Sequence, residues 1–246
     1  MKSKIIFLTV IALIGSFIAG FMVANSLNKS EIAKLRGETV NKPQTTAPAS
    51  QNPSETTLSE EEIRARLSEA DNNPENISFQ RNLGMALYKY AAMKQEANIL
   101  MEVTRLLGRV YENDKKDYEI LVTLGNCYFD AGLLKKDDST LIKSRKYYSE
   151  ALELQPKDAD VRTDLGLSYF LTTPPDVEKA LEFYKKSFQD DPSNEKTPQA
   201  IARAYFDQNN VAETEKYLAL LEKVNPENTN LIDIRSKLKT STSGGK

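Results

Sequence analysis

The sequence predicts an all-α protein in which helix hairpins stack one behind another and a single membrane helix precedes them. Two observations predict the hairpins. A short Leu-Gly-x-x-Tyr element recurs along the chain, and turn segments containing Asn, Asp and Pro separate stretches with helical spacing of apolar residues. A third observation, an uncharged apolar run near the N-terminus, predicts the membrane helix.

Composition argues against several classes of protein. The chain of 246 residues has 33 Lys and Arg against 35 Asp and Glu, and this net charge of −2 argues against nucleic-acid binding. Because it has no His and one Cys, Ser-His and Cys-His nucleophile pairs, an internal disulfide and a Cys-rich zinc site cannot be built. Neither a GxxxxGK[ST] phosphate loop nor a GxGxxG motif is present. We therefore expect no enzyme, no catalytic residue, no metal and no cofactor.

The uncharged run, IIFLTVIALIGSFIAGFMVA, covers residues 5–24. As a helix it would be about 30 Å long, the thickness of the hydrocarbon core of a bilayer. Both candidate signal-peptidase sites are poor and no Cys follows the run, so we expect residues 1–24 to be an uncleaved signal anchor. Lys2 and Lys4 favour a cytoplasmic N-terminus, although basic residues after the run weaken this assignment. The expected location is the bacterial inner membrane, with the remaining chain on the extracytoplasmic side.

Small residues recur every four positions on one face of the predicted membrane helix: Ala12, Ser16, Gly20 and Ala24. Such a stripe lets two membrane helices approach closely, which would give a homodimer. The alternative is chance, because Gly, Ala and Ser are ordinary residues in membrane helices. The stripe therefore leaves the oligomeric state open.

A polar stretch, residues 25–57, separates the anchor from the repeats. It is rich in Pro, Thr, Ser, Gln and Asn and has almost nothing to bury. We expect a disordered linker that holds the following domain away from the membrane.

The repeated element occurs four times after residue 57. Its members are Leu83, Gly84 and Leu87; Leu124, Gly125 and Tyr128; Leu165, Gly166 and Tyr169; and Ile201, Ala202 and Tyr205. The small residues are separated by 41, 41 and 36 positions, and Ala180, Tyr184 and Pro192 follow the third element. A small residue lets the first helix of a hairpin approach its neighbour, the aromatic ring fills the groove between helices, and Pro ends the hairpin. Since one hairpin cannot bury its apolar face alone, the hairpins are expected to stack.

At these residues the chain resembles the tetratricopeptide repeat (TPR) family, whose pattern is Trp-x-x-Leu-Gly-x-x-Tyr, then Ala-x-x-x-Phe and Pro. The matching residues within positions 160–194 are Leu165, Gly166, Tyr169, Ala180, Tyr184 and Pro192. The chain departs from the pattern because it has no Trp, and its first two repeats are about seven residues longer than the family's roughly 34. That difference corresponds to about two extra helical turns.

The resemblance implies a right-handed superhelical TPR solenoid over residues 58–240. We place a leading helix at 58–70 and a closing helix at 228–239, and residues 241–246 form a tail. The four hairpins are placed at 75–115, 117–156, 158–191 and 195–225. In this family the first helix of each hairpin lines a concave surface, which implies a groove that binds protein segments.

Four aromatic residues follow the Tyr or Leu of the repeated elements and would face this groove: Tyr88, Phe129, Phe170 and Phe206. Polar neighbours on the same face would include Arg81, Asn126 and Arg203. Together they would form a docking ladder for an extended or helical peptide. The alternative is that these rings pack between helices.

The predicted function is a membrane-anchored TPR scaffold or adaptor that binds a protein partner. Its layout is similar to that of membrane-tethered TPR proteins of cytochrome c maturation, a likeness of architecture alone. Two alternatives stay open: a self-assembling structural membrane protein that spaces complexes, and a TPR receptor that faces the cytosol.

Overall fold

The computed structural model of the chain describes residues 59–243. The predicted anchor (1–24), its small-residue stripe and the linker (25–57) lie outside this range. Among the described residues, no helix is both long enough and apolar enough to cross a bilayer. The chain divides into two compact units, residues 1–66 and 67–246. Apart from the first turns of the helix that begins at residue 60, the account below concerns the second unit.

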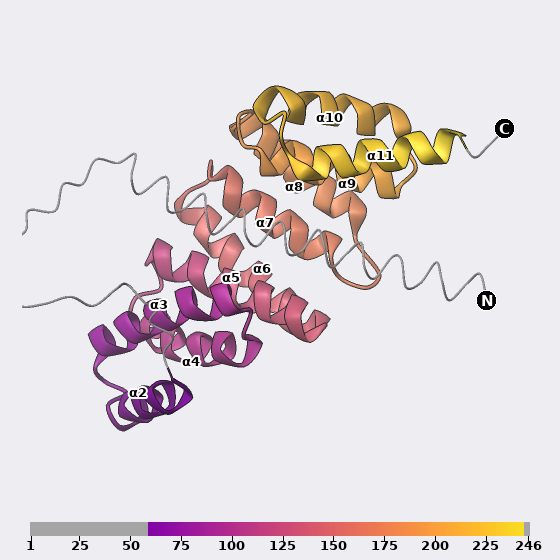
Figure 1. Cartoon of the computed structure of the whole chain (residues 1–246). Helices are drawn as coiled ribbons and strands as arrows, with labels where there is room; N and C mark the ends of the chain where they lie inside the picture. The colour runs from indigo at the N-terminus through magenta and orange to yellow at the C-terminus, as the bar shows by residue number, and fades with distance from the viewer. Residues whose placement is uncertain (1–58, 244–246) are drawn as a thin grey trace, which may run out of the picture. The chain divides into compact units, whose positions relative to one another are not determined.

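Ten α-helices follow one another through the described residues (Figure 1). They are α2 (Glu60–Asn72), α3 (Ile77–Lys94), α4 (Ala97–Asn113), α5 (Tyr118–Lys135), α6 (Asp138–Leu154), α7 (Ala159–Phe170), α8 (Val177–Asp190), α9 (Lys196–Asp207), α10 (Val211–Val224) and α11 (Thr229–Ser243). Consecutive helices from α3 to α10 pair into four hairpins. The second helix of each of the first three hairpins also packs on the first helix of the next, and α11 contacts α9 and α10. The described chain is therefore an all-α, TPR-like array of helix hairpins, as predicted.

Helix length explains why the repeats differ in spacing. The helices of the first two hairpins have 18, 17, 18 and 17 residues, whereas those of the last two have 12, 14, 12 and 14. Each of the first two hairpins thus has 35 helical residues against 26 in each of the last two. The difference of nine residues is between two and three helical turns, so the extra length of these repeats is helical.

Short polar side chains mark where helices begin. The side chains of Asn76, Asp117, Asp158, Asp176, Asn210 and Asn228 each accept a hydrogen bond from the backbone N–H three residues further on. At the turns inside three hairpins, Gln95, Lys136 and Asn209 adopt left-handed backbone conformations that end the first helix. These caps satisfy backbone groups that a helix end leaves without a partner. They are the physical reason for the Asn- and Asp-containing turns in the sequence.

The small residue of the repeated element lies where the two helices of a hairpin touch. A Cβ atom on Gly166 would be 2.6 Å from Cε1 of Tyr184, and one on Gly125 would be 2.5 Å from Cε1 of Tyr148. Both tyrosine rings are buried. Each ring therefore occupies the space that a side chain at the glycine would need, and the glycine sets how closely the helices approach.

The other members of the TPR signature are distributed between core and surface. Leu124, Leu165, Ala180, Ala202 and Tyr205 are buried, Leu83, Tyr128 and Tyr169 are half-buried, and Pro192 is exposed after the end of α8. Tyr128 stacks on Tyr147 and Tyr169 stacks on Phe183, each with ring centroids 5.5 Å apart. These rings thus join the two helices of a hairpin.

Candidate protein-binding face

The predicted groove residues lie on the first helices of the four hairpins, α3, α5, α7 and α9. We call the side of these helices that carries Tyr88, Asn126, Asp130, Asp164 and Arg203 the A-helix face. These helices are linked in order along the array: α3 contacts α5, Tyr118 of α5 donates a hydrogen bond to Asp158 before α7, and α7 contacts α9.

One member of the predicted aromatic ladder is not at the surface. Phe129 is 2% exposed, and its ring centroid is 6.4 Å from that of Tyr148. The prediction that Phe129 is open to a partner is wrong, because α5 lies between other helices and contacts α3, α4 and α6. Tyr88, Phe170 and Phe206 are half-buried. For these three side chains, contact with a partner stays a prediction.

Asn126 is also buried and is bound within the chain. Its Nδ2 donates to the hydroxyl of Tyr88 at 3.1 Å, and its Oδ1 accepts from the hydroxyl of Tyr148 at 3.0 Å. Asn126 thus ties α3 to α5 and α6, and for this side chain too contact with a partner stays a prediction. Burial first, and then nearby carboxylates, raise the pKa of both tyrosines well above the ordinary value.

The two arginines of the predicted groove are held by carboxylates of the chain. Arg81 forms ion pairs with Asp117 and, at 2.5 Å, with Glu119. The Nε of Arg203 lies 3.0 Å from the Asp207 carboxylate. An acidic ligand would have to compete with these partners, so neither arginine is a ready receptor for a carboxylate.

A group of charged residues on α7 and α9 was missed by the sequence reasoning. Nζ of Lys196 lies 3.3 Å from Oδ1 of Asp160 and 3.6 Å from Oδ1 of Asp164. We call Asp160, Asp164 and Lys196 the inner charge cluster. Burial alone would lower the pKa of Lys196, but the two carboxylates outweigh it and the pKa is raised.

A signal for part of this cluster was present in the sequence. Asp160 and Asp164 are four positions apart in the third repeat, a spacing that places two side chains on one helix face. Lys196 precedes the fourth element by about the same distance as Asp160 precedes the third. Lys196 can pair with Asp160 and Asp164 because α7 and α9 pack side by side in successive hairpins.

The hydroxyl groups of two buried tyrosines differ in their partners, which gives a test of the polar network. The Tyr148 hydroxyl is bonded to Asn126, whereas that of Tyr184 has no hydrogen-bond partner in the described structure. We expect Tyr148→Phe to lower the free energy of unfolding by about 1–2 kcal/mol, because it leaves the buried Asn126 oxygen without its donor. Tyr184→Phe should be neutral or stabilising. Urea unfolding of both variants measures the difference, and equal losses would contradict the assigned network.

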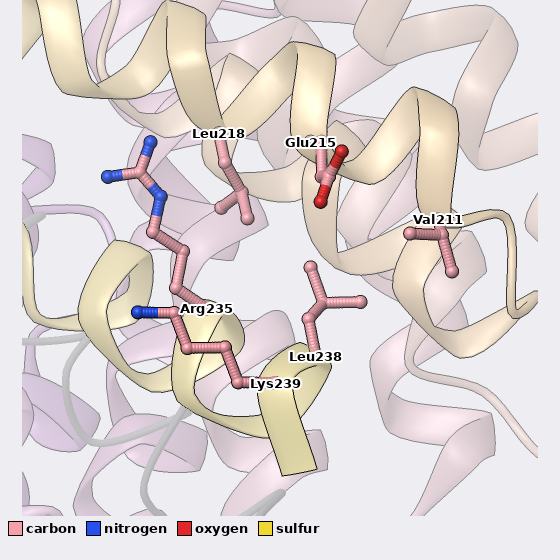
Figure 2. A pocket seen from close by; sticks show the side chains of 6 residues that line it. All are labelled: Val211, Glu215, Leu218, Arg235, Leu238 and Lys239. Atoms are coloured by element: carbon pink, nitrogen blue, oxygen red, sulfur yellow. The ribbon is translucent and has the colours of Figure 1, made fainter. Parts of the chain in front are cut away.

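A separate cavity of about 260 Å³ lies between α10 and α11 (Figure 2). Leu218 and Leu238 form its apolar part, and Glu215, Arg235 and Lys239 surround it. Arg235 is bound to both oxygens of Glu222 at 2.7 and 2.8 Å. Over residues 59–243, no three Cys, Asp or Glu side chains are placed to hold a metal ion.

Comparison with known proteins supports the fold. No protein-family model and no curated protein sequence matches the chain. The crystal structure of the MamA protein matches with a TM-score of 0.52 at 21% identity, over 68% of this chain and 82% of that one. A thermophilic TPR protein from Thermus thermophilus matches with a TM-score of 0.52 at 15% identity, over 72% and 89% of the two chains. At these identities the likeness shows a shared TPR-like fold.

Proposed function

We propose that this chain is a membrane-anchored TPR scaffold that binds a protein partner on its A-helix face. The observation that carries the proposal is the placement of half-buried aromatic side chains, Tyr88, Phe170 and Phe206, on first helices of the array. Each combines an apolar ring with partial exposure, the property of side chains that anchor partner segments. Charged residues beside them would set which partners fit.

The membrane part of the proposal rests on residues 5–24, whose length and lack of charge suit a bilayer-spanning helix. With Lys2 and Lys4 on the cytoplasmic side, the hairpin array would lie outside the inner membrane and hold a partner near it. A scaffold that helps to assemble an envelope complex fits this layout. The stripe from Ala12 to Ala24 favours a second role, in which two copies associate through the anchor.

Photo-cross-linking in cells tests the proposal. A photoreactive phenylalanine replaces Phe170 or Phe206 in the full chain. Matched controls carry it at Met93 and Ile142, which are 69% and 46% exposed on α3 and α6. We expect the same partner to be cross-linked from positions 170 and 206 and from neither control. Equal cross-linking from all four positions, or none from the first two, would rule out this binding face.

Fractionation of the same cells tests the anchor. The chain should be in the membrane fraction with residues 1–24 retained, and protease added after the outer envelope is opened should digest the array. A mature N-terminus near Asn25 contradicts retention. Protection of the array from protease would favour the receptor that faces the cytosol.

A further inference from the structure

We propose that the cavity between α10 and α11 is a second binding site, which takes an aromatic side chain, Phe or Tyr, of a partner polypeptide. The site uses no residue of the A-helix face, so it goes beyond the proposed function and does not depend on it. The cavity has a volume of about 260 Å³. Since an apolar cavity of about 150 Å³ holds benzene, one phenyl ring fits this space.

The repeat pattern identifies α11 as the first helix of a fifth repeat. Helices α5, α7, α9 and α11 each begin beside a capping side chain that accepts the backbone N–H three residues further on: Asp117, Asp158, Asn194 and Asn228. The eleventh residue after the cap is a tyrosine in the first three of these helices, namely Tyr128, Tyr169 and Tyr205. In α11 it is Lys239. The fifth repeat thus lacks the ring that three of the four preceding repeats carry at this place.

The cavity lies where this ring is missing, because Lys239 is one of the residues that line it (Figure 2). Another is Leu218, the eighth residue after the cap of α10, whereas the eighth residue after the cap of α8 is Tyr184. Both places carry a tyrosine at the junction of α8 and α9, Tyr184 and Tyr205, and neither does at the junction of α10 and α11. Because protein interiors are normally filled, the loss of two rings accounts for the empty space.

The walls of the cavity suit an apolar ring. Leu218 and Leu238 are buried and reach toward the gap from opposite helices (Figure 2). Val211 also lines the cavity and is 39% exposed, so the cavity can be reached from solvent. A ring that enters would exchange its contact with water for contact with these aliphatic side chains, which is favourable.

Basic side chains at the cavity favour an aromatic ring over an aliphatic group. The three tyrosines at the eleventh place each have a cationic group 3.8–6.0 Å from the ring centroid, supplied by Lys143, Arg145 and Lys185. In the fifth repeat two basic residues, Arg235 and Lys239, line the cavity while the ring is missing. Cations are attracted to the faces of aromatic rings, so a ring from a partner would restore the arrangement of the other repeats.

The charges around the cavity balance, which disfavours an ionic ligand. Arg235 is bound to both oxygens of Glu222, and Glu215 on α10 lines the cavity together with Lys239 on α11. Two positive and two negative charges leave none in excess. A neutral ring leaves the pairing of Arg235 with Glu222 in place, whereas a carboxylate or an ammonium group would have to compete with one of the four.

An exposed apolar residue favours a polypeptide over a free aromatic compound as the ligand. Ile232 precedes Arg235 by three positions and Lys239 by seven, so the three residues share one side of α11. The side chain of Ile232 is 57% exposed. A segment that inserts its ring between α10 and α11 can cover Ile232 with a neighbouring residue, and contacts around a central anchor exclude water from it.

Binding of matched peptides to the full chain tests the inference. Three labelled peptides of about twelve residues share an Ala, Gln and Leu framework and differ at one central position, which is Phe, cyclohexylalanine or Ala. Fluorescence anisotropy measures each affinity. We expect the Phe peptide to bind at least about tenfold more tightly than the Ala peptide, as a buried aromatic anchor does. Cyclohexylalanine is similar in size but has no π-system, so its peptide should bind about threefold more weakly than the Phe peptide.

Lys239→Tyr supplies the missing ring from the chain itself. It should fill the cavity, reduce the affinity for the Phe peptide to that for the Ala peptide, and raise the melting temperature. Lys239→Gln should keep the preference for Phe over Ala and reduce the preference for Phe over cyclohexylalanine, which tests the site without a new ring. The matched control is Lys223→Tyr, which makes the same change at an exposed position of α10 and should bind all three peptides like the parent.

Equal affinity for the Phe peptide and either of the other two, or no binding of any peptide, would overturn the inference. So would loss of the Phe preference in Lys223→Tyr, or its full retention in Lys239→Tyr. N-acetylphenylalanine amide binding as tightly as the Phe peptide would assign the cavity to a free aromatic compound and overturn the assignment to a partner polypeptide. Cross-linking from Phe170 and Phe206 does not use this cavity, so the two proposals stand or fail separately.

Discussion

Gly132→Ala is expected to destabilise the hairpin array by about 3 kcal/mol, the upper part of the usual range for overpacking. A Cβ atom at Gly132 would lie 2.5 Å from the backbone N and 2.7 Å from the Cα of Leu141. Backbone atoms of a helix cannot rotate out of the way as the end of a side chain can. The carbonyl of Gly132 also accepts the Asp137 N–H at 2.9 Å, which closes the turn. The substitution must therefore push α5 and α6 apart.

Gly108→Ala is the matched control, because it makes the same chemical change on a neighbouring helix. Gly108 lies within α4, and a Cβ atom there would meet no atom within 4 Å. Since Ala is favoured over Gly inside a helix, this variant should be more stable than the parent by about 0.5–1 kcal/mol. Urea unfolding followed by circular dichroism measures both variants. If both variants changed the free energy of unfolding by the same amount in the same direction, the close contact at Gly132 would not determine how this hairpin packs.

The array could be predicted because repeat proteins use the same local contacts several times. The glycine of the third element packs on Tyr184 in the second helix of the same hairpin, so residues in contact are also close in the sequence. Gly132 could not be identified in this way. It lies outside the repeated element, and its contact with Leu141 depends on where α6 begins and on how long the second hairpin is.

The exposure of side chains on the candidate face was predicted only in part. Phe129 and Phe170 occupy equivalent positions in the second and third repeats. Phe129 is nevertheless buried, whereas Phe170 is half-buried. The exposed fraction of a side chain depends on which helices flank it and on how long those helices are. The position of a residue within the repeat specifies neither. The same limit applies to Lys196, whose carboxylate partners lie on another hairpin. Only stacking brings these charges together.

Phe129→Ala is expected to lower the free energy of unfolding by about 3–5 kcal/mol, as removal of a fully buried ring does. Phe129 is almost fully buried and packs beside Tyr148, so truncation would leave a cavity among α3, α5 and α6 that the rigid hairpins cannot close. Phe170→Ala is the matched comparison at the equivalent position of the next repeat. Because its ring is half-buried, its loss should be smaller, about 1–2 kcal/mol.

Urea unfolding of the full chain measures both stabilities, and cross-linking from Phe206 reports partner binding by the folded fraction. Folded Phe129→Ala should still cross-link the partner, because its ring supports the face from below. Phe170→Ala should remain folded and lose cross-linking, because its ring is expected to contact the partner directly. If Phe129→Ala were as stable as Phe170→Ala and lost the partner, its ring would belong to the binding surface, and the aromatic ladder would be complete.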